Sequence, residues 1–85
     1  MASESSVAVR FMLDADAASG LLSRVVQTLA RRDLIPDQIY LERVGDILHV
    51  EIAMQAMPHD MVHLVTGNLC QVVGVRSVAQ VRLAA

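Results

Sequence analysis

Residues 14–26 read DADAASGLLSRVV, a short polar turn that passes directly into an amphipathic helix. The turn ends at Ser19-Gly20, and the first backbone N–H groups of a helix have no partners within that helix. Helped by the helix dipole, such N–H groups form a seat for a carboxylate. The stretch therefore predicts a strand-to-helix junction with a candidate anion-binding site around Gly20, Leu21 and Leu22.

The patterns on either side of this junction predict most of the fold. Residues 7–13 alternate as in a strand with one buried face, and residues 14–19 form the turn. Over 20–33, apolar residues recur at helical spacing, at Leu22, Val25, Val26, Leu29 and Ala30. Pro36 prevents this helix from continuing. Strands are expected over 37–44 and 47–54, and the tight turn Gly45-Asp46 between them makes them antiparallel neighbours.

A second helix and a fourth strand complete the chain. Pro58 suits the first turn of the helix and Gly74 its end. Its expected buried stripe is Met61, Leu64, Val65, Leu69 and Val72. The last strand, 75–83, presents Ala79, Val81 and Leu83 on its more apolar face. The order of elements predicts an α+β protein with the ferredoxin-like βαββαβ fold, a four-stranded antiparallel sheet with two helices on one face.

Size and composition limit what the chain can be. Its 85 residues, 54% of them hydrophobic, suit one domain over 7–84 after a disordered tail at 1–6. The net charge of −2, with no basic run and no Trp, argues against nucleic-acid binding. Neither a signal peptide nor an apolar run long enough for a membrane span is visible, so we expect no membrane association and a cytoplasmic location.

Three groups of reactive residues have simpler interpretations. His59 and His63 have the spacing of a zinc-protease helix, but Asp60 stands where the catalytic Glu should be, and both histidines should face solvent. Asp14 and Asp16 lack a nucleophile at recognisable spacing, so a turn-forming or helix-capping role is favoured over acid/base chemistry. Cys70 is expected to be a small buried hydrophobe. We expect no catalytic residues, metal or cofactor.

The junction resembles the opening of an ACT domain, a small module that senses amino acids in many biosynthetic proteins. In ACT domains a polar turn, often acidic, precedes a Gly-x-Leu-x-x-Val helix start, and the corresponding residues here are Asp14, Gly20, Leu22 and Val25. The resemblance is closest to the short, single-domain small subunit of acetolactate synthase. It rests on Ser19-Gly20, on Leu22-Ser23-Arg24-Val25 and on residues 69–78.

This resemblance implies a non-catalytic regulatory or activating subunit in branched-chain amino acid biosynthesis. Its catalytic large subunit would hold the thiamine diphosphate, flavin and magnesium. The alternative is a free-standing, homodimeric ACT-domain sensor that regulates another enzyme or a transporter. A small enzyme of the same fold ranks last, because no catalytic constellation is recognisable.

The resemblance also implies where an effector amino acid would bind. Its carboxylate would lie on the N–H groups of Gly20, Leu21 and Leu22, directly after Ser19, while Asp14 or Asp16 attracts the ammonium group. Ile35 and Ile39 would offer apolar contact. Valine-sensing small subunits usually carry an Asn-Ile pair where this chain has Ile35-Pro36, and the missing amide predicts weak or absent valine binding.

The predicted assembly follows from the open sheet. Such a sheet has two edges with unpaired backbone groups, and the strand 37–44 should be one of them. We therefore expect a homodimer joined through a sheet edge or through the open sheet face. A catalytic large subunit and a small amino-acid effector are the other expected partners.

Overall fold

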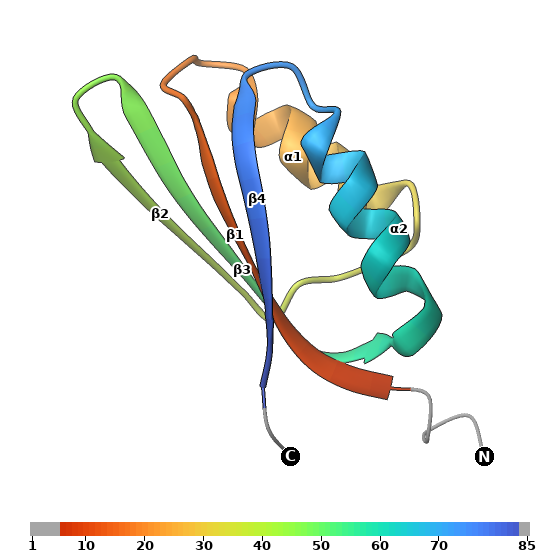
Figure 1. The fold of residues 1–85 in the computed structure, drawn as a ribbon. Coiled ribbons are helices and arrows are strands. Elements are labelled where there is room, and N and C mark those ends of the chain that lie inside the picture. The colour runs from red at the N-terminus through yellow and green to blue at the C-terminus, as the bar shows by residue number, and fades with distance from the viewer. Residues whose placement is uncertain (1–5, 84–85) are drawn as a thin grey trace.

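The computed structural model describes residues 6–83, and these form one antiparallel sheet covered on one face by two helices (Figure 1). The elements are β1 (Ser6–Asp16), α1 (Leu21–Ala30), β2 (Gln38–Val44), β3 (Ile47–Pro58), α2 (His59–Cys70) and β4 (Val75–Arg82). The strand order is β2-β3-β1-β4. The predicted ferredoxin-like fold is confirmed, and β2 lies at an edge of the sheet as expected.

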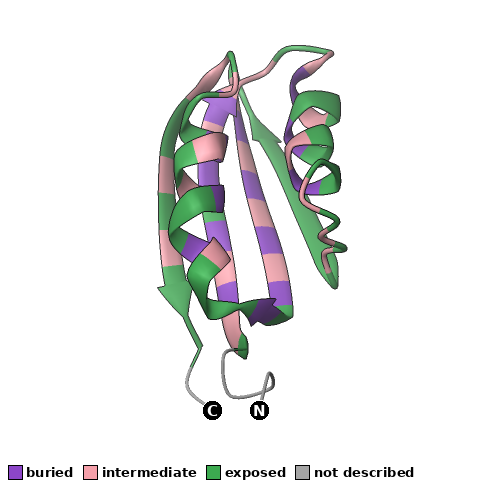
Figure 2. Ribbon diagram, turned by 90° about the vertical axis from the view of Figure 1, so that its right-hand side faces the viewer, coloured by how far each residue is buried: buried purple, intermediate pink, exposed green. Residues whose placement is uncertain are grey.

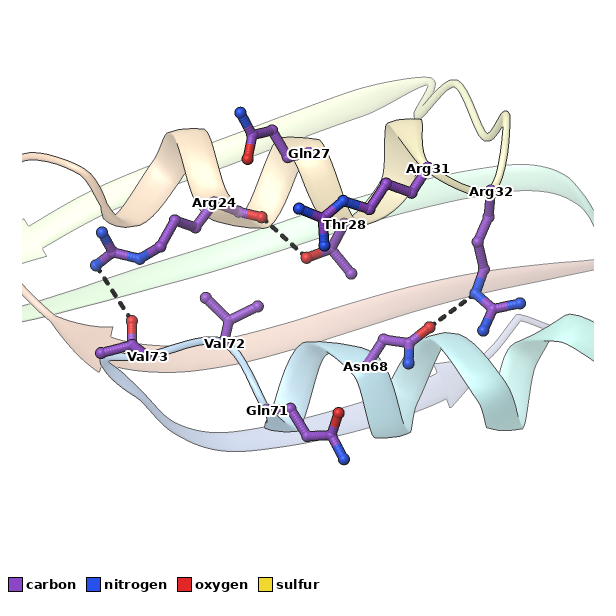
Figure 3. A pocket seen from close by; sticks show the side chains of 9 residues that line it. All are labelled: Arg24, Gln27, Thr28, Arg31, Arg32, Asn68, Gln71, Val72 and Val73. Carbon is purple, nitrogen blue, oxygen red and sulfur yellow. Dashed lines mark hydrogen bonds between the residues drawn. The ribbon is translucent and has the colours of Figure 1, made fainter.

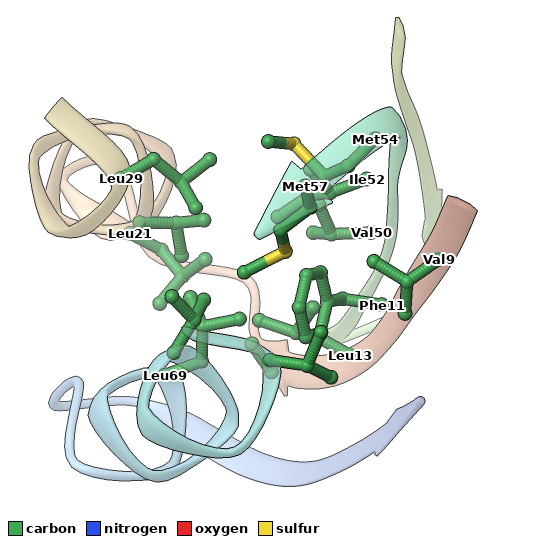
Figure 4. Close-up of a cluster of buried hydrophobic side chains, with 14 of the residues drawn as sticks. Val9, Phe11, Leu13, Leu21, Leu29, Val50, Ile52, Met54, Met57 and Leu69 are labelled. Atoms are coloured by element: carbon green, nitrogen blue, oxygen red, sulfur yellow. The ribbon is translucent and has the colours of Figure 1, made fainter. Parts of the chain in front are cut away.

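The core lies between the central strands and the helices. Alternate residues of β1 and β3 are buried and face the helices, which gives the striped pattern of these strands in Figure 2. Each helix adds one narrow stripe to the core. The largest buried side chains include Phe11, Leu13, Ile52, Met57 and Leu69, which meet in Figure 4. The predicted face of β3 is confirmed at Leu48, Val50, Ile52 and Met54.

The first strand is longer than expected. β1 continues to Asp16, because Asp14 and Asp16 pair with His49 and Ile47 of β3. The prediction that residues 14–19 form a turn is therefore wrong for its first three residues. At the other end, Ser6 belongs to β1 and pairs with Pro58, whereas the rest of the predicted tail, 1–5, lies outside the described residues.

The first helix is shorter than expected and ends before Pro36. Asp33 adopts a left-handed conformation (φ 57°), and its N–H donates to Ala30. The N–H of Leu34 donates to Leu29, which completes a Schellman-type stop. The buried stripe consists of Leu21, Val25 and Leu29, so the predicted inward positions Leu22, Val26 and Ala30 are not part of it.

The predicted inward face of the second helix is confirmed at Val65 and Leu69, and Met61 and Val72 pack against the core while partly buried. Its buried residues are Val62, Val65 and Leu69, while Leu64 is 49% exposed. Cys70 is the last residue of α2 and is exposed, so the expectation that it is buried is wrong. His59 and His63 face solvent as predicted.

The last strand has the opposite face inward from the one predicted. The pairing of β1 with β4 shifts between Asp14 and Ala15, which resets the alternation. Val78 and Gln80 then lie opposite the buried Leu13 and Phe11, whereas Val81 pairs with Arg10 on the open face. The inward Gln80 is satisfied by donating a hydrogen bond to Thr66 Oγ1 of α2 at 3.2 Å.

The hairpin between β2 and β3 closes as predicted, with Val44 opposite Ile47. Gly45 has φ 61°, which suits a type II′ turn with glycine at its first central position. This explains why Gly-Asp works here in the reverse of the commoner Asp-Gly order. No helix within residues 6–83 is long and apolar enough to cross a membrane.

Candidate functional site

The loop that enters α1 is tied to its surroundings by backbone hydrogen bonds. Asp16 N–H donates to Gly74 at 2.8 Å, and Ala17 N–H donates to Asp46 at 2.9 Å. These bonds attach the loop to the turn before β4 and to the β2–β3 hairpin. The start of α1 is therefore held at the end of the sheet where two other turns meet.

The amino end of α1 has backbone N–H groups that form no hydrogen bond with any residue that the structure describes. Gly20 is the N-cap residue, no side chain caps it, and the first turn contains no acidic residue. The N–H of Leu21 donates to Ala18 at 3.1 Å and is occupied. Within residues 6–83, the N–H groups of Leu22 and Ser23 have no acceptor. Of the predicted donors, Leu21 is occupied, whereas Gly20 and Leu22 have no backbone acceptor among the described residues, and the carboxylate seat itself stays a prediction.

A hollow of about 500 Å³ opens beside this helix end. It is lined by residues from one face of the loop and α1, spaced i, i+3, i+4, i+7 and i+8: Ser19, Leu22, Ser23, Val26 and Gln27. Sequence reasoning identified Ser19 and Leu22 and missed the other three. Their helical spacing from Ser19 was the signal that could have found them.

The two acidic residues of the predicted site do not join it. Asp14 lies on the open face of the sheet, where its carboxylate is hydrogen-bonded to the ring Nδ1 of His49. Asp16 accepts a hydrogen bond from Arg76 Nε at 2.6 Å. Both carboxylates therefore have side-chain partners on the sheet, His49 of β3 and Arg76 of β4. That one of them attracts an effector ammonium group stays a prediction.

The apolar residues of the predicted site are also dispersed. Leu21 is fully buried in the core and cannot offer its side chain to a ligand. Ile35 is 86% exposed in the loop before β2, and Ile39 is 38% exposed on β2 itself. Neither lines the hollow within this chain. Exposed apolar side chains of this kind are available to a second molecule.

Gly20 is not required by backbone conformation, because its φ of −92° suits any residue. The space above it is filled instead by Arg24, whose Nη1 would lie 2.8 Å from an added Cβ. Glycine is more strictly required at position 74 than at position 20. Its φ is +100°, and an added Cβ would approach Leu21 Cδ2 to 3.1 Å.

Fold and site together define a small ferredoxin-like module with an uncapped helix end beside an open hollow. Residues 2–85 match the family model described as ACT-like domain, and the chain therefore belongs to the ACT-like domain family. The search of curated proteins found no match.

Several solved structures have the same fold at low sequence identity. The ACT domain of GTP pyrophosphokinase from Chlorobium tepidum superposes with a TM-score of 0.77 at 14% identity, covering 89% of this chain and 99% of that one. Homoserine dehydrogenase from Thiobacillus denitrificans gives 0.78 at 16% identity, covering 93% of this chain and 18% of that one. The regulatory subunit of aspartate kinase from Thermus thermophilus, in its ligand-free form, gives 0.66 at 16% identity, covering 88% and 50%.

Proposed function

We propose that this chain is a non-catalytic regulatory module that binds an amino acid at the amino end of α1. The observation that carries the proposal is the pair of free N–H groups at Leu22 and Ser23, two residues that also line the hollow of about 500 Å³. Membership of the ACT-like domain family supports it. So do the similarities to a regulatory subunit of aspartate kinase and to a homoserine dehydrogenase.

The lining of the hollow matches the three parts of an apolar amino acid. The ligand carboxylate would accept hydrogen bonds from Leu22 and Ser23 N–H, where the helix dipole adds about 0.3–1 kcal/mol. Leu22 and Val26 offer apolar contact to its side chain. The Ser19 hydroxyl and the Gln27 side-chain oxygen, both in the lining of the hollow, would accept hydrogen bonds from its ammonium group.

A second copy of the chain would complete this site. The hollow is open on one side, and β2 is an edge strand with every residue exposed. Ile39 and Leu41 of β2 lie on the helix side of the sheet, because they pair with the buried Ile52 and Val50. We propose that two copies join through β2, so that exposed Ile35 and Ile39 of one copy approach the hollow of the other.

For the enzyme under regulation, we propose the catalytic large subunit of acetolactate synthase. The support is the resemblance of residues 19–25 and 69–78 to the small subunit of that enzyme. The proposal places the chain in the cytoplasm together with the large subunit. The alternative is a free-standing homodimeric sensor that serves another enzyme or a transporter, and the exposed β2 edge is equally compatible with it.

Calorimetry with valine, leucine and isoleucine tests the site. We expect one of the three to bind the wild-type chain, and Ser23→Asp to abolish that binding because its carboxylate would occupy the helix end. Ser23→Asn, of the same size without the charge, should retain it. Binding that survives Ser23→Asp would place the ligand elsewhere.

Copurification with the large subunit from the same source tests the partner. We expect a complex with higher turnover than the large subunit alone. Amino-acid binding without any such complex would favour the free-standing sensor.

A further inference from the structure

A second, larger hollow lies on the outer surface of the helical layer, between α1 and α2. Its volume is about 590 Å³, and nine residues line it: Arg24, Gln27, Thr28, Arg31, Arg32, Asn68, Gln71, Val72 and Val73 (Figure 3). Arg24, Gln27 and Thr28 share one face of α1, and Arg31 follows directly after this helix. On the other side, Asn68 lies in the last turn of α2, and Gln71 and Val72 follow that helix. We call this hollow the interhelical groove.

Two hydrogen bonds cross the interhelical groove, each from an arginine of α1 or the turn after it to a residue of α2 or the turn after it. Arg24 Nη2 donates to the Val73 carbonyl at 3.2 Å, and Arg32 Nε donates to Asn68 Oδ1 at 2.7 Å. Figure 3 shows these two bridges with the side chain of Arg31 between them. The two bridging guanidinium groups are therefore positioned before any ligand arrives, which reduces the entropy cost of binding.

The charged residues that line the interhelical groove are all basic. It gathers three of the seven basic residues of a chain whose net charge is −2, and none of its lining residues is acidic. Within residues 6–83, the ion pairs involve Arg10, Arg76, His49 and His59, and none involves Arg24, Arg31 or Arg32. Three positive charges without a counter-charge repel one another, and a bound anion would relieve this repulsion.

The groove also has unused hydrogen-bond donors. Among the described residues, the side chains of Gln27, Arg31 and Gln71 form no hydrogen bond. Asn68 accepts from Arg32 through its oxygen, which leaves its amide NH₂ free to donate. Guanidinium and amide donors around one hollow match the acceptor oxygens of phosphate and carboxylate groups.

From these observations we infer that the interhelical groove binds a small-molecule polyanion carrying two or more phosphate or carboxylate groups. One charged group would lie near Arg24 and a second near Arg31 and Arg32. The volume falls within the range of small-molecule sites. This ligand would bind beside the amino acid proposed above, because Gln27 lines both hollows, and the inference does not rest on that proposal.

Nuclear magnetic resonance of the 85-residue chain provides the test, with inorganic pyrophosphate, citrate and ATP as probes in a buffer free of phosphate and sulfate. We expect at least one probe to shift the side-chain amide signals of Gln27, Asn68 and Gln71. The amides of Gln38 and Gln55, on β2 and β3, serve as internal references and should not move. Comparison of pyrophosphate with citrate then distinguishes a phosphate ligand from a carboxylate one.

The matched variants are Arg31→Gln and Arg10→Gln, which remove the same charge from different faces. Arg31 is free of hydrogen bonds among the described residues, so Arg31→Gln should fold normally, and circular dichroism checks this. We expect it to weaken binding about tenfold or more, because a charge-assisted contact is lost. Arg10 lies on the open face near Glu51, and Arg10→Gln should leave binding within about twofold.

Two results would overturn the inference. One is the absence of shifts at Gln27, Asn68 and Gln71 with all three probes at millimolar concentration. The other is an equal loss of probe affinity in Arg31→Gln and Arg10→Gln. That result would show that the probes respond to the charge of the whole protein rather than to the interhelical groove.

Discussion

Arg24 occupies the space that a side chain at Gly20 would need: a Cβ built on Gly20 lies 2.8 Å from Arg24 Nη1. The same guanidinium donates to the Val73 carbonyl and so bridges α1 to the turn between α2 and β4. The absence of a side chain at Gly20 thus lets Arg24 reach across the interhelical groove. This relationship links the start of α1, where the amino acid is proposed to bind, to the groove.

Replacing Gly20 with alanine should displace Arg24 without unfolding the protein. The crowded atom is the far end of a flexible side chain, and the backbone φ of −92° suits alanine. We expect the free energy of unfolding to change by less than about 1 kcal/mol. Pyrophosphate binding should weaken, and we expect the same weakening in Arg24→Gln, which removes the guanidinium itself. Unchanged pyrophosphate affinity in Gly20→Ala would show that Arg24 does not contact the anion.

Adding a carboxylate at the amino end of α1 should stabilise the fold while blocking the effector. Ser23→Asp places a negative charge in a first turn that has none, which stabilises helices by about 0.3–1 kcal/mol. Chemical denaturation should show this gain, and calorimetry the loss of amino-acid binding. Loss of both stability and binding would instead indicate that the variant disturbs the helix start.

Asp33 offers a direct test of the α1 stop. It holds a left-handed φ of 57° that glycine adopts without strain. Asp33→Gly should therefore raise the free energy of unfolding by about 0.5–1 kcal/mol, and Asp33→Ala should lower it. Urea denaturation of both variants measures the difference, and equal effects would argue against this stop.

The two faces of β1 should respond differently to truncation. Phe11 is fully buried beneath the helices, whereas Met12 is 40% exposed on the open face. Phe11→Ala should cost about 3–5 kcal/mol, because it leaves a cavity in the core. Met12→Ala should cost less than about 1 kcal/mol in an isolated chain. A larger cost for Met12 would show that the open face is covered in solution.

The proposed dimer can be tested at the edge of the sheet. Leu41→Lys on β2 should shift the chain towards monomer in light scattering, since charged residues on an edge strand oppose pairing. Val81→Lys, on the open face of β4, is the matched control and should leave the dimer intact. The reverse pattern would assign the contact to the open face or to the β4 edge.

Hydrophobic periodicity was sufficient to predict the order of elements and the buried face of β3, and the fold expected from that order gave the edge position of β2. It failed where irregular pairing decides the outcome. The register shift opposite Asp14 turns Val81 outward and Gln80 inward, and no local pattern in 75–83 signals such a shift. The stop at Asp33 was missed because Asp rarely adopts the left-handed conformation, so Pro36 looked like the first barrier.

The candidate site was predicted in part for similar reasons. Ser19 and Leu22 were identified because they belong to the junction itself. Asp14 and Asp16 were misplaced because the length of β1 depends on its partners, β3 and β4, rather than on its own residues. The interhelical groove was not predicted at all. Arg24 and Asn68 lie far apart in sequence, and only the packing of α1 against α2 brings their faces together.

The central position of β1 has a consequence for synthesis on the ribosome. Leu13 pairs with Val50 on one side and with Val78 on the other, so the first strand made is completed by the last. The nascent chain cannot close its sheet until β4 has left the exit tunnel, and such long-range pairing is slow compared with helix formation. Until then β1 exposes an unpaired edge, which is when the growing chain is most open to mispairing with its neighbours.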